Sequence, residues 1–395
     1  MGEWLAWEAS IPNIVYNPYM NKKVAIERCP SYESETVYLA LKRALELAGG
    51  LDAAGKTLLL KPNIVFDAAP ETAICTHPVF LDAAIRLVRE LGAKRILVGD
   101  SPGLQTPGFT AKASGLGEVT KKNGAEWVDF TKEKIELPCP EGRALKKFTL
   151  TKAAEDADII INLPKLKTHQ LMCFTGAMKN LFGLIPSVAK SSFHVRFPSH
   201  SSFAAMIVDL NLALKPVYTF MDAIIGMEGP GPSGGTPRFI GLVLASPNVL
   251  ALDMAASAII AYPPGEIPVN KDALGRGIWL NGYGEIEYPG LAPREVSIPD
   301  FVKIPLKKTI PQLLNFVLPK PIRKLLEKNT PGPEINHSLC SRCGDCAKIC
   351  ASRAMGLAGT PPKMMIDYRR CIRCFCCHEI CSFNAIEIVK RPGNL

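Results

Sequence analysis

Two cysteine-rich stretches decide the fold of one end of this chain: CSRCGDCAKIC at residues 340–350 and CIRCFCCHEIC at residues 371–381. Each stretch contains a run of four cysteines that are separated by two, two and three residues. The repetition indicates an internal duplication. We therefore expect a small C-terminal unit built from two similar halves, with each half supplying ligands to metal centres.

The spacing of both runs is typical of bacterial ferredoxins, which hold two [4Fe–4S] clusters. In that arrangement the first three thiolates of a run bind one cluster, and the fourth thiolate binds the other cluster. The first cluster is therefore predicted on Cys340, Cys343, Cys346 and Cys381. The second cluster is predicted on Cys371, Cys374, Cys377 and Cys350.

Cysteines two residues apart also bind zinc, so a pair of zinc sites is the alternative. Zinc does not require a third and a fourth cysteine at these intervals, still less twice, and the spacing therefore favours iron–sulfur clusters. Two departures from the ferredoxin pattern are visible. Ala351 and Ser382 replace the proline that usually follows the fourth cysteine, and an additional thiol, Cys376, lies between two ligands, where it can compete for iron.

The chain has 395 residues, of which 47 % are apolar, and this length predicts two or three domains with a sizeable core. The N-terminus lacks the pattern of a signal peptide, and no apolar run is as long as a membrane span. Five cysteines remain outside the clusters, odd in number and irregularly spaced: Cys29, Cys75, Cys139, Cys173 and Cys376. They favour a reducing interior over a disulfide framework, and thus a cytoplasmic location.

The formal net charge of +9 would ordinarily suggest nucleic acid or an anionic membrane as a partner. Two oxidised clusters with their thiolates, at about −2 each, lower this charge to roughly +5. The basic residues are scattered and are not interleaved with aromatic side chains. We therefore expect no nucleic-acid binding, and a redox partner protein or a small anionic ligand instead.

Strand-like and helix-like stretches alternate through the body of the chain, which predicts an α/β fold with a mostly parallel sheet and flanking helices. The apolar run at 158–163 is expected to be a central strand that is buried on both faces. Further strands are expected at 22–29, 57–60, 95–98, 126–130, 148–150, 217–224 and 239–245. Helices are expected at 33–48, 77–91, 110–123, 248–261 and 272–280.

Proline and glycine at 330–333 mark a domain boundary. The segment before this boundary contains two apolar and basic pieces, which are expected to pack against the body, with docking on a membrane or a partner as the alternative. We divide the chain into an N-terminal arm (1–21), an α/β domain (22–305), a basic, proline-rich linker (306–336) and a small α+β, ferredoxin-like iron–sulfur domain (337–395).

Ligands of such sheets bind outside the carboxyl ends of the strands, and several polar segments follow predicted strands. Lys61 and Asn63 can hold an anionic or carbonyl group, or they belong to a solvated strand end. Asp100 and Ser101 lie on a tight turn, where an aspartate often only accepts bonds from backbone N–H groups.

The segment NLPKLKTH at 162–169 is the densest of these polar loops. Lys165 and Lys167 can act as bases or hold negative charge, and His169 can titrate or bind a metal. The alternative is a basic surface loop.

The segment GAMKNLFG at 176–183 predicts one or two helical turns with Lys179 and Asn180 facing outward, where they would favour phosphate or carboxylate. His194 and His200 follow. A lone histidine is more often structural, but three histidines close to these lysines indicate an active site.

Residues 229–234 formally match G-x-G-x-x-G, with Pro230 and Pro232 at variable positions. The segment leads into a predicted strand and not into the helix that a dinucleotide site requires, so we reject that interpretation. A stiff Gly/Pro loop remains at 226–235. Asp222 precedes it and Glu228 lies in it, so both can supply acidic groups to the same cleft. An ordinary surface turn is the alternative.

Four motifs in sequence order carry a resemblance: KPNIV (61–65), LPKLKTH (163–169), GAMKNLFG (176–183) and DAIIGMEGPGPSGGTP (222–237). Together they resemble the domain-of-unknown-function 362 (DUF362) family, which is often fused to a ferredoxin-type module. The resemblance covers about 22–260 and the C-terminal tail. It implies one pocket, without assigning roles, surrounded by Lys61, Asn63, Lys165, Lys167, His169, Lys179, Asn180, Asp222 and Glu228.

The leading hypothesis is an iron–sulfur redox protein whose two clusters exchange electrons with a basic cleft that binds an anionic substrate, cofactor or metal. In this hypothesis His169 donates a proton or binds a metal, and the lysines hold negative charge. The predicted catalytic residues are Lys165, Lys167, His169 and Lys179. The predicted binding residues are Lys61, Asn63, Asn180, Asp222 and Glu228.

Two other functions are considered. The first is a non-catalytic electron carrier or maturation partner that docks on a larger enzyme. The second is a non-redox ligase or transferase with structural clusters, for which the sequence offers no Walker A motif, no Ser–His–Asp constellation and no flavin motif.

Overall fold

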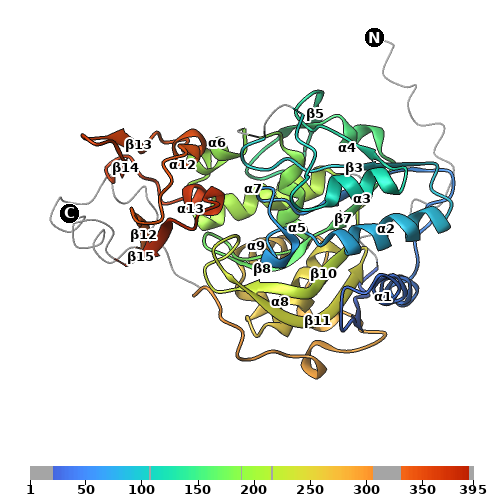
Figure 1. Cartoon of the computed structure of the whole chain (residues 1–395). Helices are drawn as coiled ribbons and strands as arrows, with labels where there is room; N and C mark the ends of the chain where they lie inside the picture. Colours follow the sequence, from blue (N-terminus) through green and yellow to red (C-terminus); the bar gives the residue numbers. More distant parts are fainter. Residues whose placement is uncertain (1–20, 106–107, 188, 215–216, 306–330, 391–395) are drawn as a thin grey trace, which may run out of the picture.

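The structure is a computed structural model that describes residues 21–105, 108–187, 189–214, 217–305 and 331–390. The predicted N-terminal arm and most of the predicted linker lie outside these residues. The body is an α/β domain built around one nine-stranded sheet (Figure 1). Its main path consists, in spatial order, of β1 (Ala25–Arg28), β11 (Thr236–Ser246), β10 (Val217–Glu228), β7 (Ile159–Leu163), β2 (Thr57–Pro62), β3 (Arg95–Val98) and β4 (Glu126–Trp127).

The centre of this sheet is parallel, because β10, β7, β2, β3 and β4 all run in the same direction. The pairs β1–β11 and β11–β10 are antiparallel and form one edge. Beyond β7, β10 pairs with β8 (Lys165–His169), which continues into the antiparallel strand β9 (Cys173–Thr175). The predicted α/β fold with a mostly parallel sheet is therefore confirmed.

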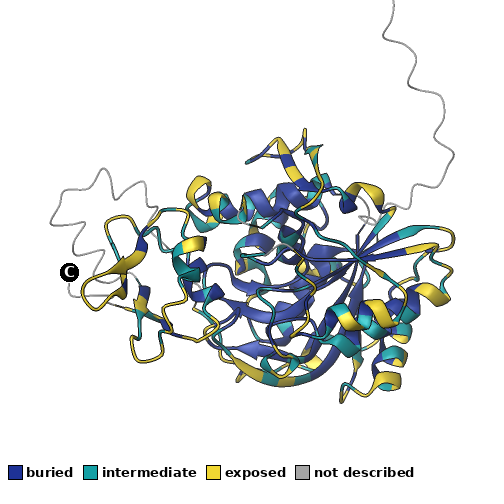
Figure 2. Cartoon of the chain, turned by 45° about the horizontal axis from the view of Figure 1, so that its top comes forward, coloured by how far each residue is buried: buried dark blue, intermediate teal, exposed yellow. Residues whose placement is uncertain are grey.

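Helices cover both faces of the sheet, and each face has its own apolar core. The first core contains strand residues such as Leu58 and Val98, and its helices are α1 (Ser34–Leu47), α2 (Pro78–Glu90) and α3 (Leu116–Lys122). The second core contains strand residues such as Leu59 and Ile160, and its helices are α5 (Ala177–Asn180), α7 (His200–Ala213), α8 (Val249–Ile259) and α9 (Pro268–Arg276). Figure 2 shows the central strands buried between these layers, as expected for their continuous apolar sequences.

Smaller elements complete the body. A hairpin, β5 (Lys134–Pro138) with β6 (Lys147–Thr151), forms a separate two-stranded sheet. The sequence predicted only the second of these strands. Two further helices are α4 (Ala153–Asp156) and α6 (Ala189–Arg196).

The segment at 162–169 is not the loop that its charges predicted. Residues from Lys165 to His169 form strand β8, which is buried along its whole length. The prediction was wrong because it assumed that the lysines need solvent. Both amino groups instead find buried acceptors: Lys165 donates to Asp222 at 2.9 Å, and Lys167 donates to the Ile74 carbonyl oxygen at 2.6 Å.

Glycine and proline explain two shifted helix boundaries. The helix expected from residue 110 begins only at Leu116, because Gly115 adopts a left-handed φ of 73°. The helix expected at 272–280 begins earlier, with Pro268 in its first turn, and it ends at Gly277, which has a φ of 64°.

The C-terminal unit repeats one pattern twice. In the first half, β12 (Gly332–Ile335) and β13 (Met355–Ala358) flank α12 (Asp345–Ile349). In the second half, β14 (Lys363–Ile366) and β15 (Ile386–Val389) flank α13 (Cys376–Ile380). The halves pair crosswise, β12 with β15 and β13 with β14. Since β12 begins at Gly332, the unit extends into the segment predicted as linker.

The unit packs on the α/β body through α12 and α13 (Figure 1). Ile349 and Ile380 from these helices pack with Phe66 and Leu104 of the body. In addition, the Ser233 hydroxyl donates to the carbonyl oxygen of Glu379 at 2.8 Å. Apolar and polar contacts together fix α13 against the body.

Candidate functional site

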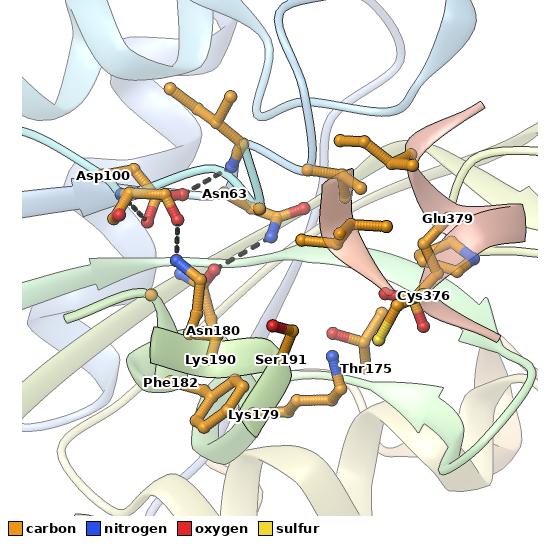
Figure 3. A pocket seen from close by; sticks show the side chains of 18 of the residues that line it. Asn63, Asp100, Thr175, Lys179, Asn180, Phe182, Lys190, Ser191, Cys376 and Glu379 are labelled. Atoms are coloured by element: carbon orange, nitrogen blue, oxygen red, sulfur yellow. Dashed lines mark hydrogen bonds between the residues drawn. The ribbon is translucent and has the colours of Figure 1, made fainter. Parts of the chain in front are cut away.

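A pocket lies where the C-terminal unit meets the α/β body (Figure 3). It opens to solvent, and side chains from both units line it. The body contributes segments that follow β2 and β3, strands β8 and β9, and the segment from α5 to α6. The C-terminal unit contributes a wall of four side chains: Ile349, Cys376, Glu379 and Ile380.

A buried ion pair forms the floor of the pocket. The Lys61 Nζ atom lies 2.7 Å from Asp100 Oδ1, and both side chains are almost completely buried. The other Asp100 oxygen accepts from the Ile64 backbone N–H at 2.6 Å. Gly183 permits this arrangement, because a Cβ atom there would lie 2.2 Å from Asp100 Oδ1. The Asp of the predicted tight turn therefore does more than cap its own turn.

Two asparagines extend this network. Asn180 Oδ1 accepts from Lys61 Nζ at 3.2 Å and from Asn63 Nδ2 at 3.0 Å. The prediction that Asn180 faces outward was wrong: its side chain is buried and also donates to Asn162 Oδ1 at 2.8 Å. Asn63 Oδ1 has no hydrogen-bond partner among the described residues.

Three further lysines line the pocket with unused hydrogen-bond donors. An ammonium group has three N–H donors. Lys167 uses one, to the Ile74 carbonyl oxygen, and Lys190 uses two, to the carbonyl oxygens of Ser101 and Ile185. Lys179 makes no hydrogen bond or ion pair within the described part of the chain, and Figure 3 shows its amino group inside the pocket.

Burial controls the charge of these amino groups. It lowers the pKa of Lys167 and of Lys190 to about 7, and it also lowers the pKa of Lys179. The positive charge of Lys179 contributes to the lowered pKa of the other two. Near pH 7 the Lys167 and Lys190 amino groups are therefore only partly protonated, and a bound anion would favour their charged forms.

The three predicted histidines take different places. His194 lines the pocket and stacks on Phe203 with ring centroids 4.5 Å apart, and burial lowers its pKa to about 3. His169 lies behind the pocket wall, and His200 begins α7 away from it. No group of three His, Cys, Asp or Glu side chains in the described ranges converges on one metal position. The arrangement therefore does not support His169, His194 and His200 as joint metal ligands.

His169 links the body to the C-terminal unit. Its Nδ1 atom accepts from the backbone N–H of Leu171 at 3.1 Å, which places the proton of the neutral ring on Nε2. Nε2 lies 3.2 Å from Glu379 Oε1 on α13. Burial lowers the pKa of His169 and raises the pKa of Glu379. The His169 ring thus lies beside the Glu379 carboxyl group, which lines the pocket.

Lys165 and Asp222 do not line the pocket, contrary to the prediction. They form a separate buried ion pair of 2.9 Å, and Tyr32 completes it by donating to Asp222 at 2.7 Å. The Lys165 amino group also donates to the Tyr32 hydroxyl at 2.6 Å. The network joins β8 and β10 to the start of α1, and Lys165 uses two of its three N–H donors in it.

Glu228 is also separate from the pocket. It ends β10 and accepts from the backbone N–H of Val302 at 2.9 Å. The predicted set of nine residues is thus divided: five line the pocket (Lys61, Asn63, Lys167, Lys179 and Asn180) and four do not (Lys165, His169, Asp222 and Glu228).

The C-terminal unit contains two cavities, and each is lined by one of the two predicted sets of four cysteines. The outer cavity is lined by Cys340, Cys343, Cys346 and Cys381. The inner cavity is lined by Cys350, Cys371, Cys374 and Cys377, with Cys376 beside them. Each cavity thus receives three thiols from one run and the fourth from the other run, which is the crosswise grouping derived from the spacing.

The donor set is compatible with a cluster. The predicted thiol ligands line both cavities, and thiolates bind iron–sulfur clusters as well as zinc. A hydrogen bond between Cys376 and Cys374 raises the pKa of Cys376 and lowers that of Cys374. Cys376 therefore suits a donor to a ligand sulfur, and Cys374 suits the ligand.

Sequence reasoning missed several residues of the pocket. Lys190 lies in α6 without any local motif, and Glu379 lies among the cysteines of the second run. Neither has a sequence signal of its own, because both enter the pocket only through the packing of segments that are distant in sequence. Asp100 and Cys376 were noticed, but not as parts of one site.

Lys167 predicts a measurable pH dependence of stability. Its pKa is about 7 in the folded protein and 10.5 without burial, so the folded state binds fewer protons between these pH values. This lysine should therefore make the free energy of unfolding rise with pH across that window, by up to about 1.4 kcal/mol per pH unit. As the pH falls from 10.5 to 7, this added free energy of unfolding is lost.

Chemical denaturation of wild type and Lys167→Met at pH 7 and pH 9 tests this expectation. The variant should lack the added slope, whereas Lys152→Met, which changes an exposed lysine, should retain it. Identical pH slopes for wild type and Lys167→Met would contradict the assignment.

Comparisons with known proteins give one family and one annotated relative. The chain matches the family described as Domain of unknown function (DUF362) over residues 58–258. It is 32 % identical over 309 residues to Thylakoid-associated protein sll1697 of Synechocystis sp., which covers 77 % of this chain and 93 % of the relative.

Two solved structures are similar in part. A protein from Thermotoga maritima has a TM-score of 0.34 at 16 % identity, over 54 % of this chain and 55 % of that chain. The lactate racemase apoprotein from Thermoanaerobacterium thermosaccharolyticum has a TM-score of 0.38 at 15 % identity, over 61 % of this chain and 56 % of that chain. This chain therefore spans little more than half the length of either structure.

No helix among the described residues has the length and apolar character that crossing a membrane requires.

Proposed function

This chain belongs to the DUF362 family, and we propose that it is an iron–sulfur redox protein. In this proposal the C-terminal unit is a ferredoxin-type domain with two [4Fe–4S] clusters, and it exchanges electrons with an anionic substrate or cofactor in the pocket. The two cavities that each gather four cysteines support this cofactor assignment. When bound, such clusters accept and donate single electrons.

The observation that carries the proposal is the position of α13. Cys376 lines both the pocket and the inner cavity, so the pocket and the inner set of cysteines share a wall. The outer cavity adjoins the inner one, since Cys346 and Cys377 belong to the same small apolar cluster. The outer cavity, the inner cavity and the pocket thus follow one another in space.

The pocket residues have distinct tasks in this proposal. Lys167 and Lys179 hold the anionic group of the ligand, and the ion pair of Lys61 and Asp100 keeps the floor rigid. Ile349 and Ile380 cover the side toward the cysteines and exclude water. The Glu379 carboxyl group lies beside the His169 ring, 3.2 Å from Nε2.

Elemental analysis and redox titration of anaerobically purified protein test the proposal. About eight iron and eight labile sulfide per chain are expected, with reduction of both centres visible by electron paramagnetic resonance. Lys179→Met at pH 6.5 should lower the midpoint potential of one centre, the inner one, on the order of tens of millivolts, because a nearby cation favours the reduced state. Lys152→Met should leave both potentials unchanged.

A protein with zinc in place of iron would end the proposal. If Lys179→Met leaves both midpoint potentials unchanged, the iron–sulfur assignment still stands. Electron exchange between the inner centre and the pocket is then contradicted.

A second candidate is an electron carrier that docks on a larger enzyme, and the surface of the outer cavity favours it. Cys343 is exposed, and the large apolar side chains of Leu339 and Phe383 are each 49 % exposed beside this cavity. Recovery of a stable complex from anaerobic extract, together with absence of ligand binding to the pocket, would favour this candidate.

We place the protein in a reducing compartment such as the cytoplasm. None of the thirteen cysteines forms a disulfide, and five of them (Cys29, Cys75, Cys139, Cys173 and Cys376) are buried outside the predicted ligand set. The relative's name associates that protein with thylakoids, which makes a membrane surface an additional location to test for this chain.

A further inference from the structure

The charges that line the pocket do not balance. Asp100 is committed to Lys61 at 2.7 Å. The three other lysines of the lining then face one remaining carboxylate, Glu379. Within the described residues, Glu379 forms no ion pair with a lysine, and its Oε1 atom faces His169 instead. Two positive charges are therefore left without a partner when the lysines are protonated.

The unused donors lie on the same side chains. Lys179 has three free N–H donors and Lys167 has two, counted over the described part of the chain. The Lys167 side chain is completely buried, so neither its charge nor its donors are satisfied by bulk water. Buried charges need both an opposite charge and hydrogen-bond partners, and a bound anion supplies both.

Part of the remaining lining is apolar. Ile64, Val65 and Phe182 from the body face the pocket together with Ile349 and Ile380 from the C-terminal unit. An inorganic ion would leave these side chains exposed to water inside the pocket. A ligand with an apolar body would cover them.

We infer that the pocket binds an organic dianion, whose phosphate or paired carboxylates are held by Lys167 and Lys179 and whose apolar body lies against Ile349 and Ile380. The inference rests on the proposed function, in that it takes this pocket as the site of the molecule that exchanges electrons with the inner cavity. It adds the charge and the character of that molecule. A phosphate monoester and a dicarboxylate share this chemistry.

The Glu379 carboxylate weakens the binding of anions to the pocket. This carboxylate lies on the wall opposite Lys179, so it repels any anion that enters (Figure 3). Replacement by glutamine removes that repulsion and keeps the size of the side chain. Glu379→Gln should therefore bind dianions more tightly than the wild type does.

The test uses three probes that share one aromatic ring: phenyl phosphate, phthalate and benzoate. Isothermal titration calorimetry of the anaerobic, iron-loaded protein at pH 7 should give affinities for a dianion that are about tenfold or more above that for benzoate. The order of phenyl phosphate and phthalate then identifies the anionic group. Lys179→Met should weaken the binding of the dianions about tenfold or more, and Lys152→Met should not change it.

Proton uptake gives an independent readout. At pH 8 the pocket lysines should take up protons when a dianion binds. The binding enthalpy should therefore depend on the ionisation enthalpy of the buffer. Phosphate buffer is avoided because phosphate is itself an anion that can enter the pocket. Equal affinity for benzoate and the dianions, or equal dianion binding by wild type and Lys179→Met, would overturn the inference. So would weaker binding by Glu379→Gln.

The two proposals fail separately. Protein that contains about eight iron but does not discriminate dianions would overturn only the ligand class. Protein that binds dianions as expected but contains no iron–sulfur centre would overturn only the redox function.

Discussion

Replacing Cys350 by alanine should halve the iron and sulfide content of the protein, from about eight to about four per chain. Cys350 belongs to the first cysteine run, but it lines the inner cavity together with three thiols of the second run. The loss should therefore affect the centre beside the pocket. Cys381→Ala is the matched control, because it removes one thiol from the outer cavity.

Double variants separate the crosswise grouping from a grouping by run. Cys350→Ala with Cys377→Ala changes one cavity twice, so about half of the iron should remain. Cys350→Ala with Cys346→Ala changes both cavities, so nearly all of the iron should be lost. The opposite result, with more iron in the second pair than in the first, would show that each run holds its own cluster. Iron and sulfide assays with electron paramagnetic resonance provide the measurement.

Replacing Lys165 by methionine should lower the free energy of unfolding by about 3–5 kcal/mol, because it leaves the Asp222 carboxylate buried without its counter-charge. Both side chains have exposures of no more than 1 %. Tyr32 would still donate to Asp222, but a hydroxyl does not replace a positive charge. The stacking of Tyr32 on His77, with ring centroids 3.6 Å apart, holds that hydroxyl in place.

Chemical denaturation measures this loss, and a double-mutant cycle assigns it. Lys165→Met combined with Asp222→Asn should lose less stability than the sum of the two single changes, because the pair is coupled. Lys152→Met, whose partners are exposed, should change stability by less than about 1 kcal/mol. If Lys165→Met is as stable as the wild type but no longer binds dianions, Lys165 takes part in ligand binding and not in stabilising the fold.

The sheet could be predicted because its signals are local. The apolar run at 158–163 can be buried only between two layers, and the glycines that follow α1 and α2 mark where helices stop. Regular cysteine spacing is also a local signal. It was sufficient to group eight thiols into the two sets of four that surround the outer and inner cavities.

The pocket could be predicted only in part, because burial of charge depends on partners that are remote in sequence. Lys165 and Lys167 are two residues apart and look alike in the sequence, yet one meets Asp222 and the other faces the pocket. Alternation along β8 does not explain this difference, because both point to the same side of a strand. Partners 57 and 93 residues away decide it: Asp222 for Lys165 and the Ile74 carbonyl oxygen for Lys167.

The pocket wall formed by α13 was outside the reach of sequence reasoning for the same reason. Glu379 and His169 belong to different units, and nothing in either segment predicts that the two side chains lie 3.2 Å apart. The resemblance to the DUF362 family located the lysine side of the pocket and left out the side that the C-terminal unit supplies.

The shared wall has a consequence for the evolution of such fusions. Under the proposed function, a ferredoxin domain taken from another protein would supply clusters, but it would not supply the side chains of Glu379 and Ile380 that line the pocket. The two parts therefore cannot be exchanged like separate modules. A change of ligand preference in the body requires a matching change in α13, so the fused halves must diverge together.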